Sequence, residues 1–365
     1  MPPKWTVAMS TEIEPRMPLS IGLALAIGLC GSGFAWLLSA PMPFLLGSFL
    51  FSGVAAASGV SFLGVKPRLP MPFRNAFIAV IGVMIGGSFH PGVFDSFGLV
   101  LLPLVCLLVF LCLAFGMNYF VFRQIGGYDK PTAFYSSMPG GLIESIALGE
   151  KAGADIRILS LQQFSRISLV ITALPFIFYI WTGEKVGSAA GASLASAARI
   201  PGAMDVLVLI VCGAVGLWVG KTIRLPAGVL VGPLILSAAA HYFGLTSAAP
   251  PAWLIATAQV VVGTGLGARF SGFRLNLIFK SVLLAVLSVT AMLLLDAVLV
   301  VLLRTTLDIP FEVLFISFAP GGVTETALIA LSLGADPVFV TMLHVFRIIV
   351  TVFACSAGAK FILRK

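Results

Sequence analysis

Apolar runs of about twenty residues are the feature that most restricts what this chain can fold into. Residues 97–122 and 281–303 form two of these runs, and each is long enough for a helix to cross the ~30 Å of hydrocarbon in a bilayer. Charged residues make up only 10% of the 365 residues, whereas a soluble domain carries about 25%. Too few charges remain to build a water-facing surface, so the sequence predicts an all-α integral membrane protein.

The net charge of +8 is spread over short segments between the apolar runs. Basic residues gather in such segments on the cytoplasmic side of membrane proteins, and the sequence has no basic stripe or zinc-ligand spacing, so we expect no nucleic-acid partner. The five cysteines fall inside apolar stretches without paired spacing. This pattern indicates free thiols, and we expect neither a metal site nor a cofactor.

The chain contains a long internal repeat. Residues 134–167 match residues 315–348 without a gap, at one constant offset. The matched pairs are Pro139-Gly140-Gly141 with Pro320-Gly321-Gly322, Glu144 with Glu325, Asp155 with Asp336, Arg166 with Arg347, and, upstream, Gly82 and Gly86 with Gly263 and Gly267. Nearer the N-terminus the register slips, so that Pro41 matches Pro226. We therefore predict two related membrane repeats, residues 18–182 and 203–363, joined by a small-residue linker at 183–202.

Each half has six apolar stretches, of which one is weak. The weak stretches, 131–149 and 311–333, contain the Pro-Gly-Gly triplets, which are poor choices for a simple lipid-facing helix. The other ten are predicted to span the membrane: 18–38, 43–62, 73–89, 97–121 and 157–182, then 203–220, 226–245, 252–270, 281–303 and 338–362.

The basic residues in the loops distinguish two topologies. If the weak stretches cross the membrane, the cytoplasmic loops hold 13 Lys and Arg and the outer loops 7; if they enter and return, the counts are 17 and 3. The larger cytoplasmic excess favours the second topology. We therefore predict two inverted repeats of five transmembrane helices in the inner (plasma) membrane, each with a Pro-Gly-Gly re-entrant or broken segment before its fifth helix.

Inverted repeats with interrupted segments at equivalent positions are typical of secondary transporters. A break frees backbone N–H and C=O groups, which are tolerated at membrane depth only where they face protein or a water-filled cavity. A half-helix that begins after Pro-Gly-Gly directs its positive end at that cavity, which suits an anion. The resulting hypothesis is secondary active transport of a small polar, anionic solute, coupled to a proton or sodium gradient, and not an enzymatic activity.

The candidate substrate- or ion-binding residues are Gly140, Gly141, Glu144, Arg166, Gly321, Gly322, Glu325 and Arg347. The two glutamates follow the last glycine of each triplet by three residues, where a carboxylate either binds a coupling ion or caps a helix start. The two arginines fall about halfway through the bilayer and must face the interior. Each either holds an anionic substrate or is a structural partner of a glutamate or of the freed carbonyls.

Other polar residues in the repeat have structural explanations. Asp155 and Asp336 open the next helix and are predicted to be N-caps. Gln162, Gln163 and His344 break the symmetry between the halves, and helix-packing hydrogen bonds are expected of them, with a role in selectivity as the alternative. The repeated glycines have the spacing of close helix packing.

The duplicated Pro-Gly-Gly, Glu, Gly-Ala-Asp and Arg block resembles the AbrB family of bacterial membrane proteins over nearly the whole chain. That family is described variously as an ammonia monooxygenase, a regulator or a transport protein. The arrangement of five spans with a glycine-rich re-entrant loop before the fifth also resembles sodium-coupled carboxylate symporters, by architecture alone.

Two alternative functions follow from these resemblances. A membrane regulatory or sensor protein would need a partner, since the sequence has no long soluble segment. A membrane-bound monooxygenase would need clustered copper or iron ligands, and His90, His241 and His344 lack a metal-ligand spacing. The partners considered are a small-molecule or ion substrate, the lipid bilayer and further copies of the chain in a homo-oligomer.

Overall fold

The computed structural model describes residues 17–62, 64–89, 97–183, 202–273, 275–307 and 309–362. In the first half the helices are α1 (Met17–Leu37), α2 (Pro43–Ala57), α3 (Met71–Gly87), α4 (Phe97–Phe120) continued by the π-helical turn η2 (Val121–Ile125), α5 (Lys130–Ser136), α6 (Leu142–Lys151) and α7 (Ile156–Thr182). In the second half they are α9 (Ala203–Thr222), α10 (Gly228–Tyr242), α11 (Ala252–Gly267) with the short 3-10 turn η3 (Ala268–Phe270), α12 (Leu275–Arg304), α13 (Phe311–Phe318), α14 (Val323–Ser332) and α15 (Pro337–Ile362). The predicted linker, apart from its two end residues, lies outside the described residues.

The described residues confirm the prediction of an all-α membrane protein. They form helices, with one isolated bridge between Phe62 and Val65. Six helices are long and apolar enough to cross a membrane, namely α1, α4, α7, α9, α12 and α15, as judged by length and composition.

Of the other four predicted spans, three are shorter than predicted, while α3 has the predicted length but begins and ends two residues earlier. α2 and α10 have 15 residues each, α11 has 16 and α3 has 17, against about 20 for a helix that crosses perpendicular to the bilayer. The predicted ends at residues 62 and 245 are wrong because the chain turns earlier, at Gly59 and Gly244. Both glycines have positive φ angles, +69° in each case, which a helix does not accommodate.

The two halves contain the same order of helices. The first residue of α10 is the repeat equivalent of the first residue of α2, and the same holds for α11, α13, α14 and α15 with α3, α5, α6 and α7. The residues before α2 and α10, Met42 and Ala227, both adopt a left-handed conformation. Matching sequence therefore produces matching local structure, including at an unusual backbone position.

The Pro-Gly-Gly triplets interrupt the helices. The first triplet separates α5 from α6 and the second separates α13 from α14, and these four helices have only 7 to 10 residues each. Proline lacks an N–H to continue a helix, and Gly141 has a positive φ of +60° at the start of α6. Both weak stretches of the sequence are thus pairs of short helices around a non-helical break.

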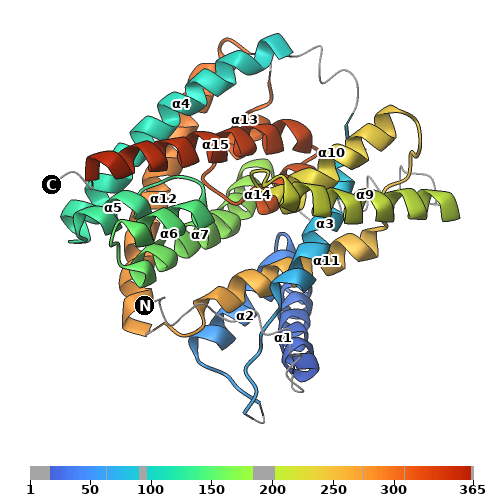
Figure 1. Cartoon of the computed structure of the whole chain (residues 1–365), viewed down its shortest axis with the longest axis horizontal. Coiled ribbons are helices and arrows are strands. Elements are labelled where there is room, and N and C mark those ends of the chain that lie inside the picture. The colour runs from blue at the N-terminus through green and yellow to red at the C-terminus, as the bar shows by residue number, and fades with distance from the viewer. Residues whose placement is uncertain are drawn as a thin grey trace.

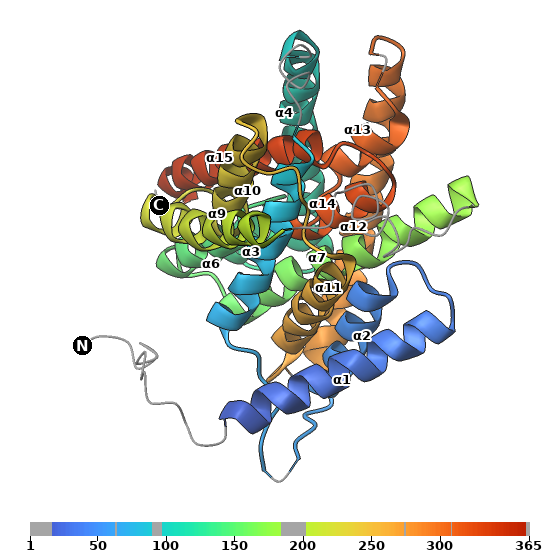
Figure 2. The ribbon, with the colours of Figure 1, turned by 90° about the vertical axis from the view of Figure 1, so that its right-hand side faces the viewer.

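The helices pack as two groups (Figures 1 and 2). The lateral group consists of α1, α2, α3, α9, α10 and α11, which pack on one another in the series α1–α2–α11–α3–α10–α9. The broken-helix group consists of α4, α5, α6, α7, α12, α13, α14 and α15. The principal contact between the groups is made by α3, which packs against α14 and α15.

Glycine backbones join the two halves within the lateral group. A Cβ added at Gly82 of α3 would lie 2.5 Å from the carbonyl oxygen of Leu230 in α10, and one added at Gly263 of α11 would collide with the carbonyl oxygen of Leu45 in α2. Leu230 is the repeat equivalent of Leu45, as Gly263 is of Gly82. Close packing therefore explains these glycines, and it does so by crossing the halves.

Gly82→Ala should destabilise the protein by about 1–3 kcal/mol, because the added methyl group overpacks a helix contact that cannot close further. Thermal unfolding of the purified protein in detergent measures the change. Gly116→Ala in α4 is the matched control, since a Cβ there meets nothing within 4 Å and alanine favours a helix by about 1 kcal/mol over glycine. Equal unfolding temperatures for Gly82→Ala and Gly116→Ala would contradict the packing argument.

Candidate functional site

A cavity of about 400 Å³ lies between the two helix groups and is lined by both Pro-Gly-Gly breaks. All eight predicted site residues line it: Gly140, Gly141, Glu144 and Arg166 from the first half, and Gly321, Gly322, Glu325 and Arg347 from the second. The lateral group contributes the ends of α3, α10 and α11. Equivalent residues of the two repeats, far apart in the sequence, thus converge on one space.

The arginines hold the carbonyl groups that the breaks set free. Arg347, only 1% exposed, donates hydrogen bonds to the carbonyl oxygens of Ala319 and of Gly321, the latter at 2.7 Å. Arg166, 6% exposed, donates to the carbonyl oxygen of Met138, the repeat equivalent of Ala319. The sequence left two roles open for these arginines, binding an anionic substrate or supporting the structure. The hydrogen bonds to the carbonyl groups are of the structural kind, and both side chains also border the cavity.

A glutamine gives the first break an additional donor. The side-chain amide of Gln163 donates to the carbonyl oxygens of Tyr135, Ser136 and Met138 at 3.1 to 3.3 Å. The equivalent residue in the second half is His344, whose Nδ1 contacts the carbonyl oxygen of Val340 in its own helix. Gln163 thus makes hydrogen bonds between helices, as expected, whereas His344 bonds within its own helix and does not.

The glutamates fold back over the starts of the short helices. A Cβ added at Gly322 would collide with the carboxylate of Glu325, and one added at Gly141 would lie 3.5 Å from the carboxylate of Glu144. Each carboxylate therefore sits at the N-terminal end of its helix, α14 or α6, where a negative charge is stabilised. The capping role weighed from the sequence agrees with this geometry.

Arg347 does not pair with Glu325, which was one of the partners that the sequence allowed. The charges that interact with Glu325 are Arg74 and Arg269, while those that interact with Arg347 are Arg166 and Asp296. The reason is that the guanidinium of Arg347 is turned toward the backbone of the break.

Sequence reasoning missed Arg74 and Arg269 as site residues, because both were counted as loop charges. Arg74 lies in the first turn of α3 and Arg269 in η3, and both line the cavity. Arg269 also stacks over the ring of Phe164 in α7, 5.0 Å from its centroid, and so bridges the two helix groups. Their position in the sequence could have indicated them, since each arginine is at the end of an apolar stretch and not in the middle of a polar loop.

The cavity carries an excess of positive charge. Four arginines (Arg74, Arg166, Arg269 and Arg347) and two glutamates line it, which gives +2 when all six are ionised. Because a low-dielectric wall strengthens such a field, the lining attracts anions.

The two N-cap predictions are confirmed. Asp155 accepts hydrogen bonds from the backbone N–H groups of Arg157 and Ile158 at 2.9 and 3.2 Å, and Asp336 caps α15 in the same way. Gln162 donates to the hydroxyl of Tyr128 at 2.7 Å, and because Tyr128 lies between η2 and α5, this bond joins α7 to a connecting segment and not to another helix.

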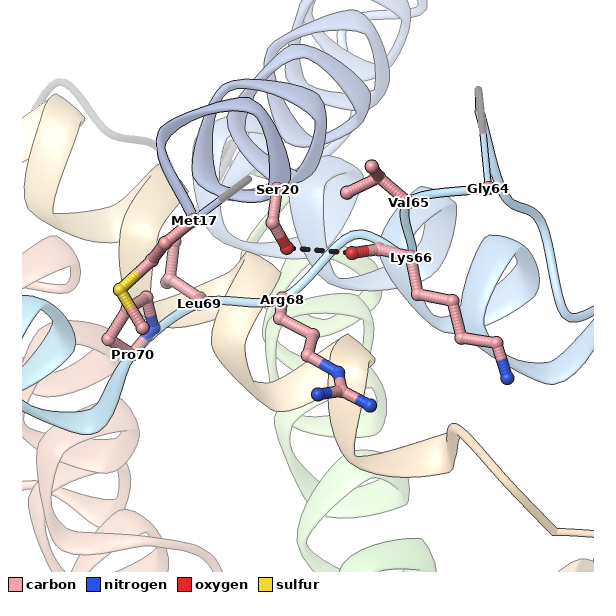
Figure 3. A pocket seen from close by; sticks show the side chains of 8 residues that line it. All are labelled: Met17, Ser20, Gly64, Val65, Lys66, Arg68, Leu69 and Pro70. Carbon is pink, nitrogen blue, oxygen red and sulfur yellow. Dashed lines mark hydrogen bonds between the residues drawn. The ribbon is translucent and has the colours of Figure 1, made fainter. Parts of the chain in front are cut away.

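The described residues hold no group of three or more His, Cys, Asp or Glu side chains placed to bind a metal ion; His90 lies outside them. A second depression, of about 430 Å³, lies beside the start of α1 (Figure 3). Ser20 there donates to the carbonyl oxygen of Lys66 at 2.7 Å, and the side chains of Lys66 and Arg68 extend away from α1. It contains none of the predicted site residues.

Arg347→Gln should destabilise the protein by about 1–3 kcal/mol for each carbonyl group left without a donor. Arg166→Gln should cost less, because Gln163 still donates to the carbonyl of Met138. The double variant Arg166→Gln/Gln163→Leu should lose about as much stability as Arg347→Gln, as measured by thermal unfolding in detergent. Rescue of Arg347→Gln by a second change, Glu325→Gln, would instead indicate that these two residues form a charge pair.

Comparison with known proteins finds relatives that match most of the chain. The chain is 24% identical over 305 residues to the Escherichia coli protein named "Putative regulator AbrB", which covers 83% of this chain and 86% of that protein. It is 26% identical over 259 residues to "Uncharacterized protein YhjN" of Bacillus subtilis, which covers 68% of this chain and 67% of that protein. A sequence model of the AbrB family, described as transition state regulatory protein AbrB, matches residues 44–363. The chain belongs to the AbrB family of multi-pass membrane proteins.

Proposed function

We propose that this protein is a secondary active transporter of a small polar, anionic solute. The observation that carries the proposal is the single cavity with a net charge of +2, formed where the broken segments of both halves meet. Non-helical backbone at membrane depth is a common way to build a substrate site in transporters. A volume of about 400 Å³ is within the range of small-molecule sites.

Arg74 and Arg269 are the residues that we assign to the anion. The hydrogen-bond donors of Arg166 and Arg347 are engaged by backbone carbonyls, whereas Arg74 and Arg269 have the carboxylate of Glu325 as their common counter-charge. Two arginines facing one glutamate leave one positive charge uncompensated. A carboxylate on a solute would supply the missing partner.

The proposed topology is the inverted arrangement predicted from the loop charges, with five spans in each half. In that topology the starts of α3 and α10 and the end of α11 all lie on the cytoplasmic side, and these are the ends that line the cavity. The conformation described here is then open toward the cytoplasm. Transport would require the broken-helix group to move relative to the lateral group, and their limited contact, mainly through α3, supports such a movement.

A membrane regulator is the second candidate, supported by the name of the Escherichia coli relative. Binding of an anion in the same cavity would then change the contact between the helix groups without moving the solute across the bilayer. The monooxygenase alternative has less support, since the cavity lining offers two glutamates and no histidine or cysteine. Flux measurements separate transport from both alternatives.

The topology predicts which side of the membrane each loop faces. In a variant without the five native cysteines, single cysteines at Lys151 and Lys221 should react only with reagent on the cytoplasmic side, and one at Thr305 only from outside. All three positions are exposed. Ser188, in the predicted linker, is a further position expected outside, and it lies beyond the described residues. Labelling of Lys151→Cys and Lys221→Cys from outside would exclude the inverted arrangement.

Purified protein in liposomes should take up small carboxylates in response to a proton or sodium gradient, without ATP. Arg74→Gln and Arg269→Gln should each lower uptake at least tenfold, the effect of losing about 1.4 kcal/mol of anion binding. Arg68→Gln is the matched control, because Arg68 lines the separate depression beside α1 (Figure 3).

Absence of flux across carboxylates and amino acids would count against transport. In that case, anion binding without flux would favour the regulator, and bound redox metal would favour the enzyme. Full activity of both Arg74→Gln and Arg269→Gln would show that the anion binds elsewhere.

A further inference from the structure

A buried carboxylate lies next to the candidate site and takes part in none of the hydrogen bonds described above. Asp296, in the middle of α12, is 0% exposed, and neither of its carboxylate oxygens has a hydrogen-bond partner. It does not line the cavity. An ionised carboxylate is far costlier to bury in this state than the neutral acid.

Neighbouring residues on α12 show which way Asp296 points. Ser288 donates to the side chain of Asn118 in α4 at 2.6 Å, and the Asn118 amide lies 3.2 Å from the sulfur of Met292. Asp296 follows Met292 by one helical turn and so continues the same face. The side chain therefore points into the broken-helix group and away from lipid.

Arg347 is the charged residue that interacts with Asp296. The other helices packed on α12 have few charged residues that could interact with Asp296. α4 has none, and α13 has only Glu312, in its first turn. On α7, Arg166 interacts with Arg347, and on η2 the guanidinium of Arg123 donates to the carbonyl of Tyr128.

His344, the other titratable group near Arg347 on α15, bonds within its own helix. Asp296 and Arg347 therefore interact through their charges, with no hydrogen bond between them, in a largely apolar surrounding.

The proton on Asp296 and the geometry of the second break compete for the same arginine. While Asp296 is neutral, Arg347 is available to bind the carbonyl groups of Ala319 and Gly321. Once Asp296 is ionised, its charge attracts the guanidinium of Arg347 and weakens those bonds. The repeat equivalent of Asp296 in the first half is Phe115, so only the second half has this device.

We propose that Asp296 is the proton-carrying residue of this protein, protonated while Arg347 holds the break between α13 and α14 and deprotonated when Arg347 turns to it. The proton is exchanged with water that enters the cavity beside Arg347. Asp296 thereby links a proton to the shape of a cavity wall, which names the proton as the coupling ion. This coupling role rests on the proposed transport function, whereas the protonation state of Asp296 does not.

Infrared spectroscopy of the purified full-length protein tests the protonation state directly. At neutral pH the wild type should show a C=O stretching band of a protonated carboxylic acid that Asp296→Asn lacks and Glu312→Gln retains. The band should disappear as the pH is raised, and Arg347→Gln should move that loss to higher pH, because the positive charge that favours ionisation is gone.

An unchanged spectrum in Asp296→Asn at every pH would overturn the proposal, since Asp296 would then be ionised throughout. If Asp296→Asn or Arg347→Gln cannot be purified, carbon-13 labelling of the aspartates in the wild type replaces the variants: a shift of the band on labelling supports the proposal, and no shift overturns it.

Liposomes test the coupling role separately. With any carboxylate that the wild type takes up, Asp296→Asn should keep solute exchange at equal pH on both sides and lose the stimulation by a proton gradient. Retained stimulation would overturn the coupling role. Absence of uptake by the wild type would count against transport itself, and the infrared band would still decide the state of Asp296.

Discussion

The carbonyl groups freed at the two helix breaks are the constraint on which the rest of the structure depends. Backbone polar groups cannot be left unpaired at membrane depth, and the Pro-Gly-Gly triplets free several of them near the middle of the molecule. Arg347 supplies donors to the second break, and Arg166 with Gln163 supplies donors to the first. The two arginines among these donors carry positive charge into the interior and contribute to the charge of the cavity, and Arg347 lies within the electrostatic reach of the buried acid Asp296.

The lateral group gives the breaks a second wall. Its helices approach closely because glycines such as Gly82 and Gly263 place backbone against backbone at their contacts. The broken-helix group packs mainly within itself and touches the lateral group mainly through α3. A site formed between two such groups is sensitive to their relative position, which is the property that a transporter or a membrane sensor requires.

Charge in the cavity is arranged differently from what helix dipoles alone suggest. The N-terminal ends of α6 and α14 face the cavity, but Glu144 and Glu325 occupy them. In the proposed function, the positive charge available to a solute therefore comes from Arg74 and Arg269 and not from the helix ends. The carboxylate of Glu325 offsets one of these two arginine charges. One further negative group, on a solute, would offset the other.

Several properties were determined by the sequence alone. Apolar runs fixed the membrane class, and the duplicated block located the breaks at Pro139 and Pro320 and the residues that converge on the cavity. These predictions agree with the structure because helix length, helix breaking by proline and glycine, and repetition can be read directly along the chain. The sequence could not show that Arg347 binds backbone carbonyls and not the carboxylate of Glu325. Both kinds of partner lie in the same repeated block, and spacing along the chain does not distinguish them. Nor could the sequence show that Arg74 and Arg269, at the ends of apolar stretches, line the cavity, or that Asp296 lies beside it. Whether a charge at a helix end faces a cavity, and whether a carboxylate within an apolar helix faces an arginine, depends on which helices pack side by side, and only the tertiary structure decides that.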